Sequence, residues 1–414
     1  MAKEVRFGVI GLGCRGSMLM NWAMFDLYDK GLRVTAVCDL YEDRVKKASD
    51  EIFEKFAYRP FETTDPYELI NSDKVDVVII ATAWEAHVEL AIASMKAGKF
   101  TGLEVGGAYT LEDCWRLVDT YEETKTPFMF LENCNFGKRE TMLLNMVRKG
   151  LLGEIVHCAG GYCHDLRIEV ANGKENRHYR LRNYLNRNCE NYPTHEIGPI
   201  AKVLDINNGN RFLSLVSMAS SAKGLHQYIL DKKGADHPLA NAEFKQGDIV
   251  TTILKCANGE TVTITLDTTL PRCYSRLFTV RGTKGAYFEE NDMLYLQADQ
   301  TTEDGRGLWG NAKQYEEEHL HEIWQGYTPI GGHDGMDYLL FDALLECAQT
   351  GKKPPLDVYD AATYMCITPL SEKSINLGGA PVEIPDFTRG KWFNRTDIGE
   401  DWKYNFDRTD REIL

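Results

Sequence analysis

The first residues whose types and spacing suggest chemistry form a glycine-rich turn near the N-terminus. Gly11, Gly13 and Gly16 have the GxGxxG spacing, after an apolar run and before a segment of helical length. In a strand–turn–helix unit these glycines permit a tight turn, close approach of the backbone to a pyrophosphate, and close packing of helix on strand. Cys14 and Arg15 lie within the same turn. The sequence therefore predicts a dinucleotide site at Gly11, Gly13, Cys14, Arg15 and Gly16.

An acidic residue further along favours NAD as that dinucleotide. Asp39 follows Gly16 by 23 residues and ends the second apolar run, where an acidic side chain binds the ribose hydroxyls. A carboxylate there repels the 2′-phosphate of NADP, although Arg15 and Arg33 could offset this preference. The alternative is a glycine turn in a nucleotide-free fold, with Asp39 as a strand cap. Because strand, turn, helix and acid occur in order, we favour the dinucleotide.

The elements that position this turn alternate strands with helices. Short β-branched runs and helix-length segments over the first 130 residues or so predict βαβ units. We expect an α/β fold whose N-terminal part is a Rossmann domain with a doubly wound parallel sheet. The predicted strands are Val5–Ile10, Val34–Cys38, Val75–Ala81, Phe100–Leu103 and Phe128–Leu131. The predicted helices are near Ser17–Tyr28, Asp43–Phe56, His87–Ala97 and Leu111–Thr124.

After Arg139 the pattern changes to alternating apolar and polar residues, which predicts a large, mainly antiparallel open sheet in an α+β domain. The predicted strands include Phe212–Met218, Ile249–Lys255, Thr261–Asp267 and Ser275–Arg281, and helices return at Gly335–Gln349 and Val358–Leu377. We therefore expect an NAD-binding domain at residues 1–134 and a substrate-binding and oligomerisation domain at 135–414. The helix at 358–377 is a candidate to pack back on the first domain.

Composition excludes several classes of partner. The net charge of −15 and a pI near 5.2 disfavour nucleic acid and anionic membranes as ligands. No run approaches the roughly 18 apolar residues of a spanning helix, and the N-terminus lacks a signal-peptide pattern, so we expect a cytoplasmic protein. Eleven scattered cysteines are expected to be reduced thiols. No metal site is predicted, because His and Cys residues lack zinc-ligand spacing.

Several further motifs carry a resemblance. They are Trp84-Glu85-Ala86-His87, Glu104-Val105, Glu132-Asn133-Cys134-Asn135 and Tyr192-Pro193-Thr194-His195. With the glycine turn, they make the chain resemble the Gfo/Idh/MocA family of oxidoreductases. Within that family it looks most like the NAD-dependent glycosidases of glycoside hydrolase family 109, typified by α-N-acetylgalactosaminidases. The resemblance runs over most of the chain, as far as Gly331-Gly332-His333.

The resemblance implies roles for individual residues. His195 is the expected base for the C3 hydroxyl of a sugar. Tyr162 is a second candidate for proton transfer, whose pKa nearby positive charge would need to lower, and the alternative is a plain contact with the sugar. The expected substrate contacts are Arg180, Tyr192, Tyr274, Glu132 and His333. Arg182 is the alternative to Arg180, and a cofactor contact is the alternative for Glu132. The expected cofactor contacts beyond the glycine turn and Asp39 are Trp84, His87, Glu104, Val105 and Asn133.

The implied reaction is hydrolysis of a glycoside without net redox change. NAD⁺ accepts hydride from C3, the resulting ketone acidifies the C2 proton, the C1 leaving group is eliminated, water adds, and the hydride returns. The lysine that the family's dehydrogenases carry after the conserved glutamate is replaced by Val105, which favours the glycosidase. A nearby Lys or Tyr that substitutes for that lysine is the alternative. The glycine that usually follows the Tyr-Pro-Thr-His block is Glu196, so the sugar specificity is the least transferable feature.

Two other readings remain open from the sequence. One is an NAD-dependent sugar or inositol dehydrogenase with His195 as base, and the other is a non-catalytic NAD-dependent sensor. We expect a small glycoside, an α-N-acetylgalactosaminide or a related hexoside, as the substrate. We also expect a homo-oligomer, a dimer or larger, formed through the C-terminal sheet.

Overall fold

The computed structural model describes residues 3–300 and 307–408. The chain divides into two compact units, each built from segments distant in sequence. The first unit holds residues up to 136 together with 323–363 and the described residues from 396 onward. The second unit holds residues 137–322 and 364–395. Each unit is described by itself below.

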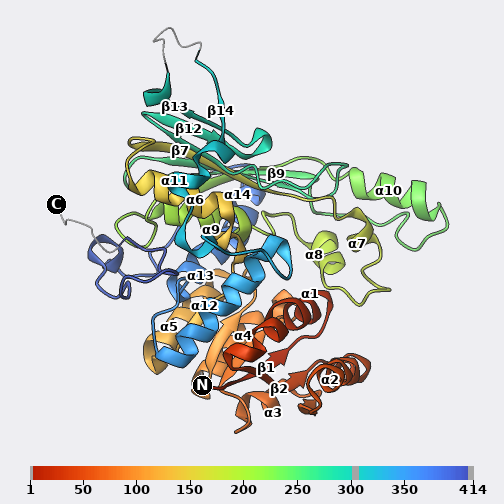
Figure 1. Cartoon of the computed structure of the whole chain (residues 1–414). Helices are drawn as coiled ribbons and strands as arrows, with labels where there is room; N and C mark the ends of the chain where they lie inside the picture. The colour runs from red at the N-terminus through yellow and green to blue at the C-terminus, as the bar shows by residue number, and fades with distance from the viewer. Residues whose placement is uncertain (1–2, 301–306, 409–414) are drawn as a thin grey trace. The chain divides into compact units, whose positions relative to one another are not determined.

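The first unit is built on a six-stranded parallel sheet with the order β3-β2-β1-β4-β5-β6 (Figure 1). Its strands are β1 (Val5–Ile10), β2 (Leu32–Cys38), β3 (Phe61–Thr63), β4 (Val77–Ile80), β5 (Phe100–Leu103) and β6 (Phe128–Phe130). Every residue of β4 and β5 is buried, as expected for strands covered on both faces. Because the chain leaves β1 first toward β2 and later toward β4, the sheet is doubly wound, which confirms the predicted Rossmann fold.

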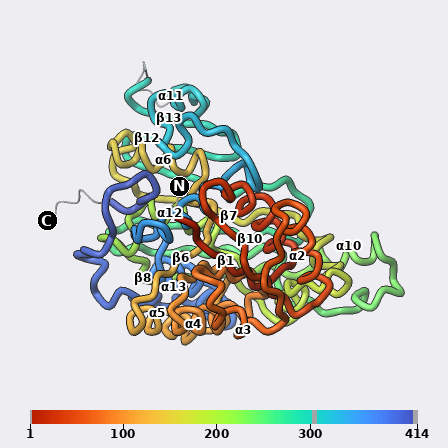
Figure 2. The backbone as a smooth tube through the Cα atoms, turned by 60° about the horizontal axis from the view of Figure 1, so that its bottom comes forward, coloured from red at the N-terminus to blue at the C-terminus, as the bar shows by residue number. Residues whose placement is uncertain are grey.

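The helices of the first unit follow the strands. They are α1 (Cys14–Leu19), α2 (Glu42–Phe56), α3 (Pro66–Asn71), α4 (Trp84–Lys96), α5 (Leu111–Thr124), α12 (Met336–Thr350) and α13 (Val358–Met365), the last of which reaches the boundary with the second unit. The chain continues from α1 as a π-helical turn and a 3-10 helix to Lys30. Helix α4 packs against α3 and α5, and Figure 2 shows these three helices close together. The short elements β3 and α3 were not predicted from the sequence.

The second unit contains a nine-stranded sheet with the order β14-β13-β12-β11-β7-β10-β9-β8-β15. Its strands are β7 (Ile155–Cys163), β8 (Phe212–Ala219), β9 (Ile249–Cys256), β10 (Thr261–Asp267), β11 (Thr279–Gly282), β12 (Gly285–Phe288), β13 (Met293–Leu296), β14 (Gly310–Asn311) and β15 (Val382–Glu383). Only β7 and β10 pair in parallel among these strands, and the other pairs are antiparallel. The mainly antiparallel sheet predicted for this region is therefore confirmed.

Helices of the second unit lie on this sheet and at its ends. They are α6 (Lys138–Arg148), α7 (Arg167–Ala171), α8 (Arg180–Asn186), α9 (Thr194–Val203), α10 (Gly224–Lys233), α11 (Glu316–His319) and α14 (Ile367–Asn376). Helix α9 packs on β7 and α14 on β8. Residues along β9 and β10 alternate between buried and more exposed positions, so one face of these strands stays open.

Several predicted elements differ from those observed. The helix predicted near Ser17–Tyr28 is α-helical only to Leu19 and continues as a π-helical turn and a 3-10 helix. The strand predicted over Ser275–Arg281 is confined to β11, because Ser275 forms only an isolated bridge with Cys163. The helix predicted over Val358–Leu377 is divided at Cys366 into α13 and α14. All eleven cysteines are free thiols. Within the described ranges, none of the helices has the length and apolarity needed to cross a bilayer.

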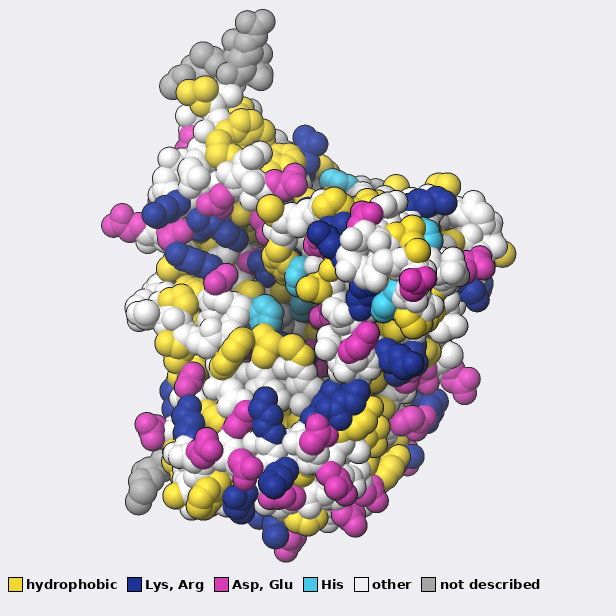
Figure 3. Space-filling model, turned by 90° about the vertical axis from the view of Figure 1, so that its right-hand side faces the viewer, with side chains coloured by type: hydrophobic (Ala, Val, Ile, Leu, Met, Phe, Trp, Pro, Cys, Tyr) yellow, Lys and Arg dark blue, Asp and Glu magenta, His cyan; other side chains and the backbone are white. Residues whose placement is uncertain are grey.

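The surface of the chain carries charges of both signs. Figure 3 shows Lys and Arg side chains interspersed with Asp and Glu side chains over much of the face that it draws. Many of these charges form ion pairs, such as Arg116 with Glu89 at 2.6 Å and Arg59 with Asp50 at 2.9 Å. Exposed pairs of this kind contribute little to stability, typically about 0–1 kcal/mol.

Candidate active site

The glycine turn in the first unit has the geometry that a dinucleotide requires. Gly11 has a φ of +95°, in the region that favours glycine, and a Cβ on Gly16 would collide with the carbonyl oxygen of Gly11. By contrast, a Cβ on Gly13 would meet only the guanidinium of Arg44, at 3.4 Å. Two glycines therefore shape the turn, and the third leaves backbone open to a ligand, so the residues present fit an NAD pyrophosphate.

Asp39 is fixed beside this turn at the end of β2. Its side chain is 6% exposed, and its carboxylate accepts hydrogen bonds from the backbone N–H groups of Leu12, at 2.7 Å, and Tyr41, at 3.0 Å. The basic side chain nearest to it is that of Arg44, 3.5 Å away, which the sequence did not single out. Arg33 instead pairs with Glu4 at 3.0 Å. Asp39 thus keeps a fixed carboxylate where the ribose hydroxyls of NAD would bind.

Arg15 of the glycine turn belongs to a buried ionic network. Its Nε donates to Glu104 at 2.8 Å, and its two terminal nitrogens donate to the carboxylate of Asp337 at 2.8 and 2.9 Å. The same carboxylate accepts from Asn133 Nδ2 at 2.8 Å and lies 2.8 Å from His333 Nδ1. Asp337 on α12 therefore joins residues that follow β1 and β6 and, through Arg15, the residue that follows β5.

His333 contacts both charged members of this network, Arg15 and Asp337. Asp337 is 1% exposed, and although burial alone would raise the pKa of its carboxyl, Arg15 and His333 hold that pKa well below its usual range. Nδ1 of His333 lies 2.8 Å from this carboxylate, which accepts, and 3.2 Å from Nη1 of Arg15, which donates. Nε2 is then the remaining ring nitrogen of a side chain that is 38% exposed. Sequence spacing could not reveal Asp337, which lies 322 residues from Arg15.

The residues after β4 and β5 pack together. Glu104 accepts a hydrogen bond from the backbone N–H of Val105 at 2.9 Å, and Val105 is 3% exposed. A Cβ on Gly106 would collide with the indole of Trp84, so the residue after Val105 must be small. His87 on α4 is buried, which lowers the pKa of its imidazole to about 4, and its Nε2 lies 3.1 Å from the carbonyl oxygen of Thr82.

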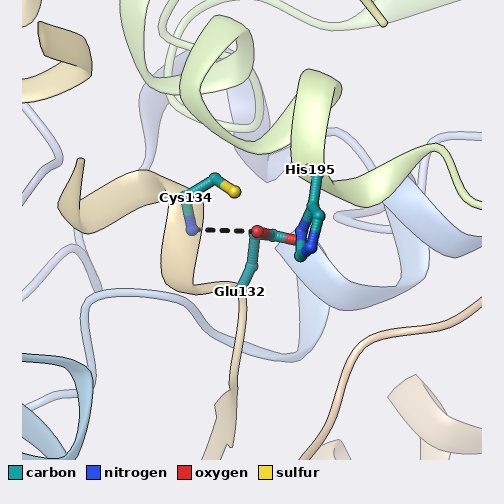
Figure 4. Close-up of side chains that lie close together, drawn as sticks. All are labelled: Glu132, Cys134 and His195. Atoms are coloured by element: carbon teal, nitrogen blue, oxygen red, sulfur yellow. Dashed lines mark hydrogen bonds between the residues drawn. The ribbon is translucent and has the colours of Figure 1, made fainter. Parts of the chain in front are cut away.

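The turn after β6 holds two further predicted residues. Glu132 is fully buried, and its carboxylate accepts a hydrogen bond from the backbone N–H of Cys134 at 3.0 Å (Figure 4). Asn133 is 1% exposed and bonded to Asp337 as described above. Both side chains are therefore held at the carboxyl edge of the parallel sheet, where ligands of such folds bind.

Three predicted substrate and catalytic residues form an aromatic cluster in the second unit. The ring of Tyr162, at the end of β7, lies 4.4 Å from the ring of Tyr192 and 5.6 Å from that of His195, measured between centroids. Tyr192 and His195 are 4.8 Å apart in an edge-to-face arrangement. His195 projects from the first turn of α9 (Figure 4). This helix begins at Thr194, directly after Pro193, so the Tyr-Pro-Thr-His block forms the helix start.

Arg180 on α8 supplies positive charge to this cluster. Its guanidinium carbon lies 4.9 Å from the ring centre of Tyr192 and 5.9 Å from that of Tyr162, and its Nε pairs with Glu169 at 2.9 Å. Burial nevertheless dominates at Tyr162 and raises the pKa of its phenol to about 12, against the lowering by Arg180. The lowered pKa that a base at Tyr162 would need is therefore not produced by Arg180.

His164 is a member of this cluster that the sequence did not single out. Its Nδ1 lies 3.2 Å from the hydroxyl of Tyr162, and burial lowers the pKa of its imidazole. Tyr274, which is 50% exposed, places its ring 5.2 Å from that of His164 and 6.5 Å from that of Tyr162. The spacing of Tyr162 and His164, two residues apart across the end of β7, is the signal that could have found it.

A buried acid lies just before the Tyr-Pro-Thr-His block. Glu190 is fully buried, and burial raises the pKa of its carboxyl to about 8. Its Oε1 accepts a long hydrogen bond of 3.4 Å from the backbone N–H of Tyr192, and Oε2 has no hydrogen-bond partner in the described chain. The segment around it is held by Gln246, whose side chain bonds both the N–H and the carbonyl of Cys189 and the side chain of Asn191.

The predicted substrate residues thus divide between the units. The second unit brings Arg180 and Tyr192 together with His195 and Tyr162, and Tyr274 lies at the edge of this group through its contact with His164. Glu132 and His333 belong to the first unit. All predicted cofactor residues also belong to the first unit, which carries the glycine turn.

Comparison with known protein families identifies both parts of the chain. Residues 136–394 match the model of the glycosyl hydrolase 109 C-terminal domain. Residues 5–131 match the model of the oxidoreductase family with an NAD-binding Rossmann fold. The chain belongs to glycosyl hydrolase family 109. Its cofactor is NAD, bound by the Rossmann domain of the first unit.

Curated relatives support the same family assignment. The chain is 38% identical over 424 residues to a glycosyl hydrolase family 109 protein of Parabacteroides distasonis, covering 95% of this chain and 88% of that protein. It is 39% identical over 417 residues to an alpha-N-acetylgalactosaminidase of Tannerella forsythia, covering 94% of this chain and 88% of that protein. The family resemblance inferred from the motifs is therefore confirmed.

Solved structures share the fold of this family 109 member. A levoglucosan dehydrogenase in complex with NADH and levoglucosan superposes with a TM-score of 0.70 at 19% identity, covering 92% of this chain and all of that one. An NAD-binding oxidoreductase from Klebsiella pneumoniae gives a TM-score of 0.69 at 15% identity, covering 92% and 99% of the two chains. At these identities the likeness concerns the fold alone.

Proposed function

We propose that this chain is an NAD-dependent glycosidase that hydrolyses α-N-acetylgalactosaminides or related hexosides without net redox change. The observation that carries the proposal is the cluster of Tyr162, Tyr192, His195 and Arg180 in the glycosyl hydrolase 109 domain. It combines two proton-transfer groups with aromatic surface and a cation. The alpha-N-acetylgalactosaminidase of Tannerella forsythia, 39% identical, supports the sugar class.

The residues of the first unit hold the cofactor. Gly11, Gly13 and Gly16 would accommodate the pyrophosphate, Asp39 would bind the adenosine ribose, and Asn133 would contact the nicotinamide ribose or amide. Arg15 is oriented by Glu104 and Asp337. When bound, NAD supplies a reversible hydride acceptor for C3 of the sugar.

The residues of the second unit transfer protons. His195 accepts the proton of the C3 hydroxyl and later returns it. Tyr162 exchanges the proton at C2, assisted by the hydrogen bond between its hydroxyl and His164. Because burial raises the pKa of Tyr162 to about 12, the phenol is protonated at neutral pH, and its deprotonation has to be coupled to acceptance by His164. Tyr192 and Tyr274 offer rings to the apolar face of a pyranose.

Val105 supports hydrolysis over net oxidation. It occupies the place of the lysine that assists proton transfer in the dehydrogenases of the wider family, and its side chain is buried. A site without that ammonium group lacks the side chain that assists proton transfer during net oxidation of an alcohol. We therefore place the chain with the glycosidases. The alternative is a sugar dehydrogenase, and the following experiment distinguishes the two.

The test is a panel of nitrophenyl α- and β-glycosides, including N-acetylhexosaminides, incubated with the purified chain and NAD⁺. Nitrophenol and NADH are followed at separate wavelengths. The proposal predicts nitrophenol release without accumulation of NADH. Stoichiometric NADH from free sugars or polyols, with the glycosides intact, would instead establish a dehydrogenase.

A further inference from the structure

The second unit contains a hollow beside the aromatic cluster, and of its lining residues only Tyr274 has a role in the hydrolysis proposed above. Its volume is about 290 Å³, and it is lined by Arg272, Cys273, Tyr274, Ser275, Glu289 and Glu290. Small-molecule sites begin at about 300 Å³, so this hollow, here called the Arg272 hollow, has room for one small polar group such as a single sugar residue.

Tyr274 links the Arg272 hollow to the aromatic cluster. Its ring is 5.2 Å from His164 and perpendicular to it, while the side chain remains 50% exposed. His164 in turn lies 3.2 Å from the hydroxyl of Tyr162. The hollow is thus one ring away from a proton-transfer group, on the same unit and through contacts within that unit.

Two charged groups of the hollow have bonding capacity left over. The guanidinium of Arg272 is fixed by Asp267, 2.8 Å from Nη1, and by the carbonyl oxygen of Cys273, 3.0 Å from Nε. Within residues 3–300 and 307–408, Nη2 donates to no protein acceptor, and the carboxylate of exposed Glu290 accepts no hydrogen bond. Glu289 differs, because it accepts from the backbone N–H groups of Arg276 and Phe278 and so serves the turn itself.

These groups fit a neutral polyhydroxylated ligand. Arg272 would repel a cation and Glu290 would repel a phosphate or carboxylate, so neither charged class is favoured. A planar guanidinium donor and a carboxylate acceptor together can bind neighbouring hydroxyl groups, since each hydroxyl both donates and accepts. The half-exposed Tyr274 ring adds an apolar surface for a pyranose.

We propose that the Arg272 hollow binds the leaving group of the glycoside when that group is itself a sugar. This inference rests on the proposed glycosidase function, since a leaving group exists only if a glycosidic bond is broken. It implies that the substrate in use is a disaccharide or longer glycan, with the cleaved residue at the Tyr162–His195 cluster and the next residue against Arg272 and Glu290.

The test compares two substrates with the same cleaved sugar. One is the nitrophenyl glycoside that the wild-type chain hydrolyses in the panel above, and the other is that sugar linked to a hexose. Glu290→Gln removes the charge of an exposed side chain, and Arg272→Lys keeps the charge that faces Asp267 but removes the planar donor pair. Glu317→Gln, at an exposed position on α11, is the matched control.

For Glu290→Gln and Arg272→Lys we expect kcat/KM on the disaccharide to fall about tenfold, the scale of a lost hydrogen bond to a charged group, mainly through KM. The value on the nitrophenyl glycoside should stay within about twofold by the same scale. Equal losses on both substrates, or no loss on either, would overturn the inference. If the wild-type chain cleaves neither substrate, the proposed function itself fails. Glu317→Gln should match wild type on both.

Discussion

At the residue scale, the chemistry depends on an imidazole and a phenol that lie close together in a largely buried cluster. His195 is 8% exposed and Tyr162 is 5% exposed, and their rings contact each other and Tyr192. In such surroundings electrostatic effects are stronger than in water. Burial accordingly raises the pKa of the Tyr162 phenol to about 12. Substitution of either group should affect the reaction more than the fold.

Replacement of His195 by Asn tests the assignment of the C3 base. Asn keeps a similar shape and hydrogen-bonding capacity but cannot accept a proton, so kcat should fall by about 10²- to 10⁴-fold, the usual contribution of general acid–base catalysis. Steady-state kinetics on the best glycoside of the panel measures this. The thermal midpoint and the NAD affinity should remain near wild type, and an unchanged kcat would show that His195 is not the base.

The buried carboxyl of Glu190 should make the free energy of unfolding depend on pH. Its folded-state pKa is raised to about 8 from the ordinary 4.5, because burial disfavours the carboxylate. Between these values the folded chain keeps the proton and the unfolded chain loses it, so stability falls as pH rises, by up to about 1.4 kcal/mol per pH unit. Glu190→Gln removes this contribution.

Urea unfolding of wild type and Glu190→Gln across this pH range measures the effect. The variant should gain stability over wild type as the pH rises from about 5 to 8. Glu317→Gln, which changes an exposed carboxyl, should follow wild type throughout. A constant difference between wild type and Glu190→Gln at every pH would contradict the raised pKa.

At the scale of elements, one carboxylate on α12 organises the carboxyl edge of the parallel sheet. Asp337 accepts from Arg15 after β1 and from Asn133 after β6, and Arg15 extends the network to Glu104 after β5. Loops are the most mobile parts of a fold, and a buried ion pair tied into hydrogen bonds restrains them. We therefore expect the network to fix the side chains of the proposed NAD site.

Asp337→Asn should loosen this arrangement. Removing one partner of a buried ion pair lowers the free energy of unfolding by about 3–5 kcal/mol. Because the Arg15 side chain is 26% exposed, we expect a loss of stability at or below the lower end of that range. NAD affinity, measured by calorimetry on the purified chain, should fall by about tenfold or more. Asp334→Asn, on the same turn but exposed, should leave the affinity unchanged. Wild-type NAD affinity in Asp337→Asn would refute this organising role.

The elements show how far local sequence determines the fold and where it stops. The strands β1, β4 and β5 and the glycine turn could be predicted because their signals, continuous apolar runs and glycine spacing, are local. The elements β3 and α3 were missed because three and six residues are too few for periodicity to register. Asp337 and Gln246 could not be found, because each acts through contacts with residues far away in the sequence.

The same limit applies within the candidate site. The Tyr-Pro-Thr-His block and Arg180 were predicted through a family resemblance, and the structure places Arg180 over the rings of Tyr162 and Tyr192. The effect of burial on Tyr162 could not be read from spacing, because desolvation depends on everything packed around the phenol. The site residues could thus be chosen from the sequence, whereas the effect of burial on their pKa values required the structure.

At the scale of the whole molecule, we propose that the chain forms a homo-oligomer through the open face of the second sheet. Ile253 on β9 is 46% exposed, and Met218 on β8 is 68% exposed. The two strands are neighbours in the sheet and pair with each other. Apolar side chains on the open face of a sheet are typical of surfaces that bind another chain. A second copy of the same chain would cover them symmetrically.

Size-exclusion chromatography with light scattering tests this. The wild-type chain should elute with a mass that is a multiple of 47.0 kDa, and Ile253→Arg should shift it toward the single-chain mass. Tyr67 on α3 of the first unit is 51% exposed. Tyr67→Arg is therefore the control and should leave the mass unchanged. A single-chain mass for wild type would rule out the oligomer.

The central claim is that hydrolysis proceeds through transient oxidation at C3 and loss of the C2 proton. The most direct measurement is hydrolysis of the best glycoside in D₂O, with NMR of the released sugar and a no-enzyme control for exchange of the free product. We predict deuterium at C2, because the proton removed there equilibrates with solvent before water addition completes the reaction. A sugar released with protium fully retained at C2 would contradict the account, since direct displacement at C1 never breaks that bond.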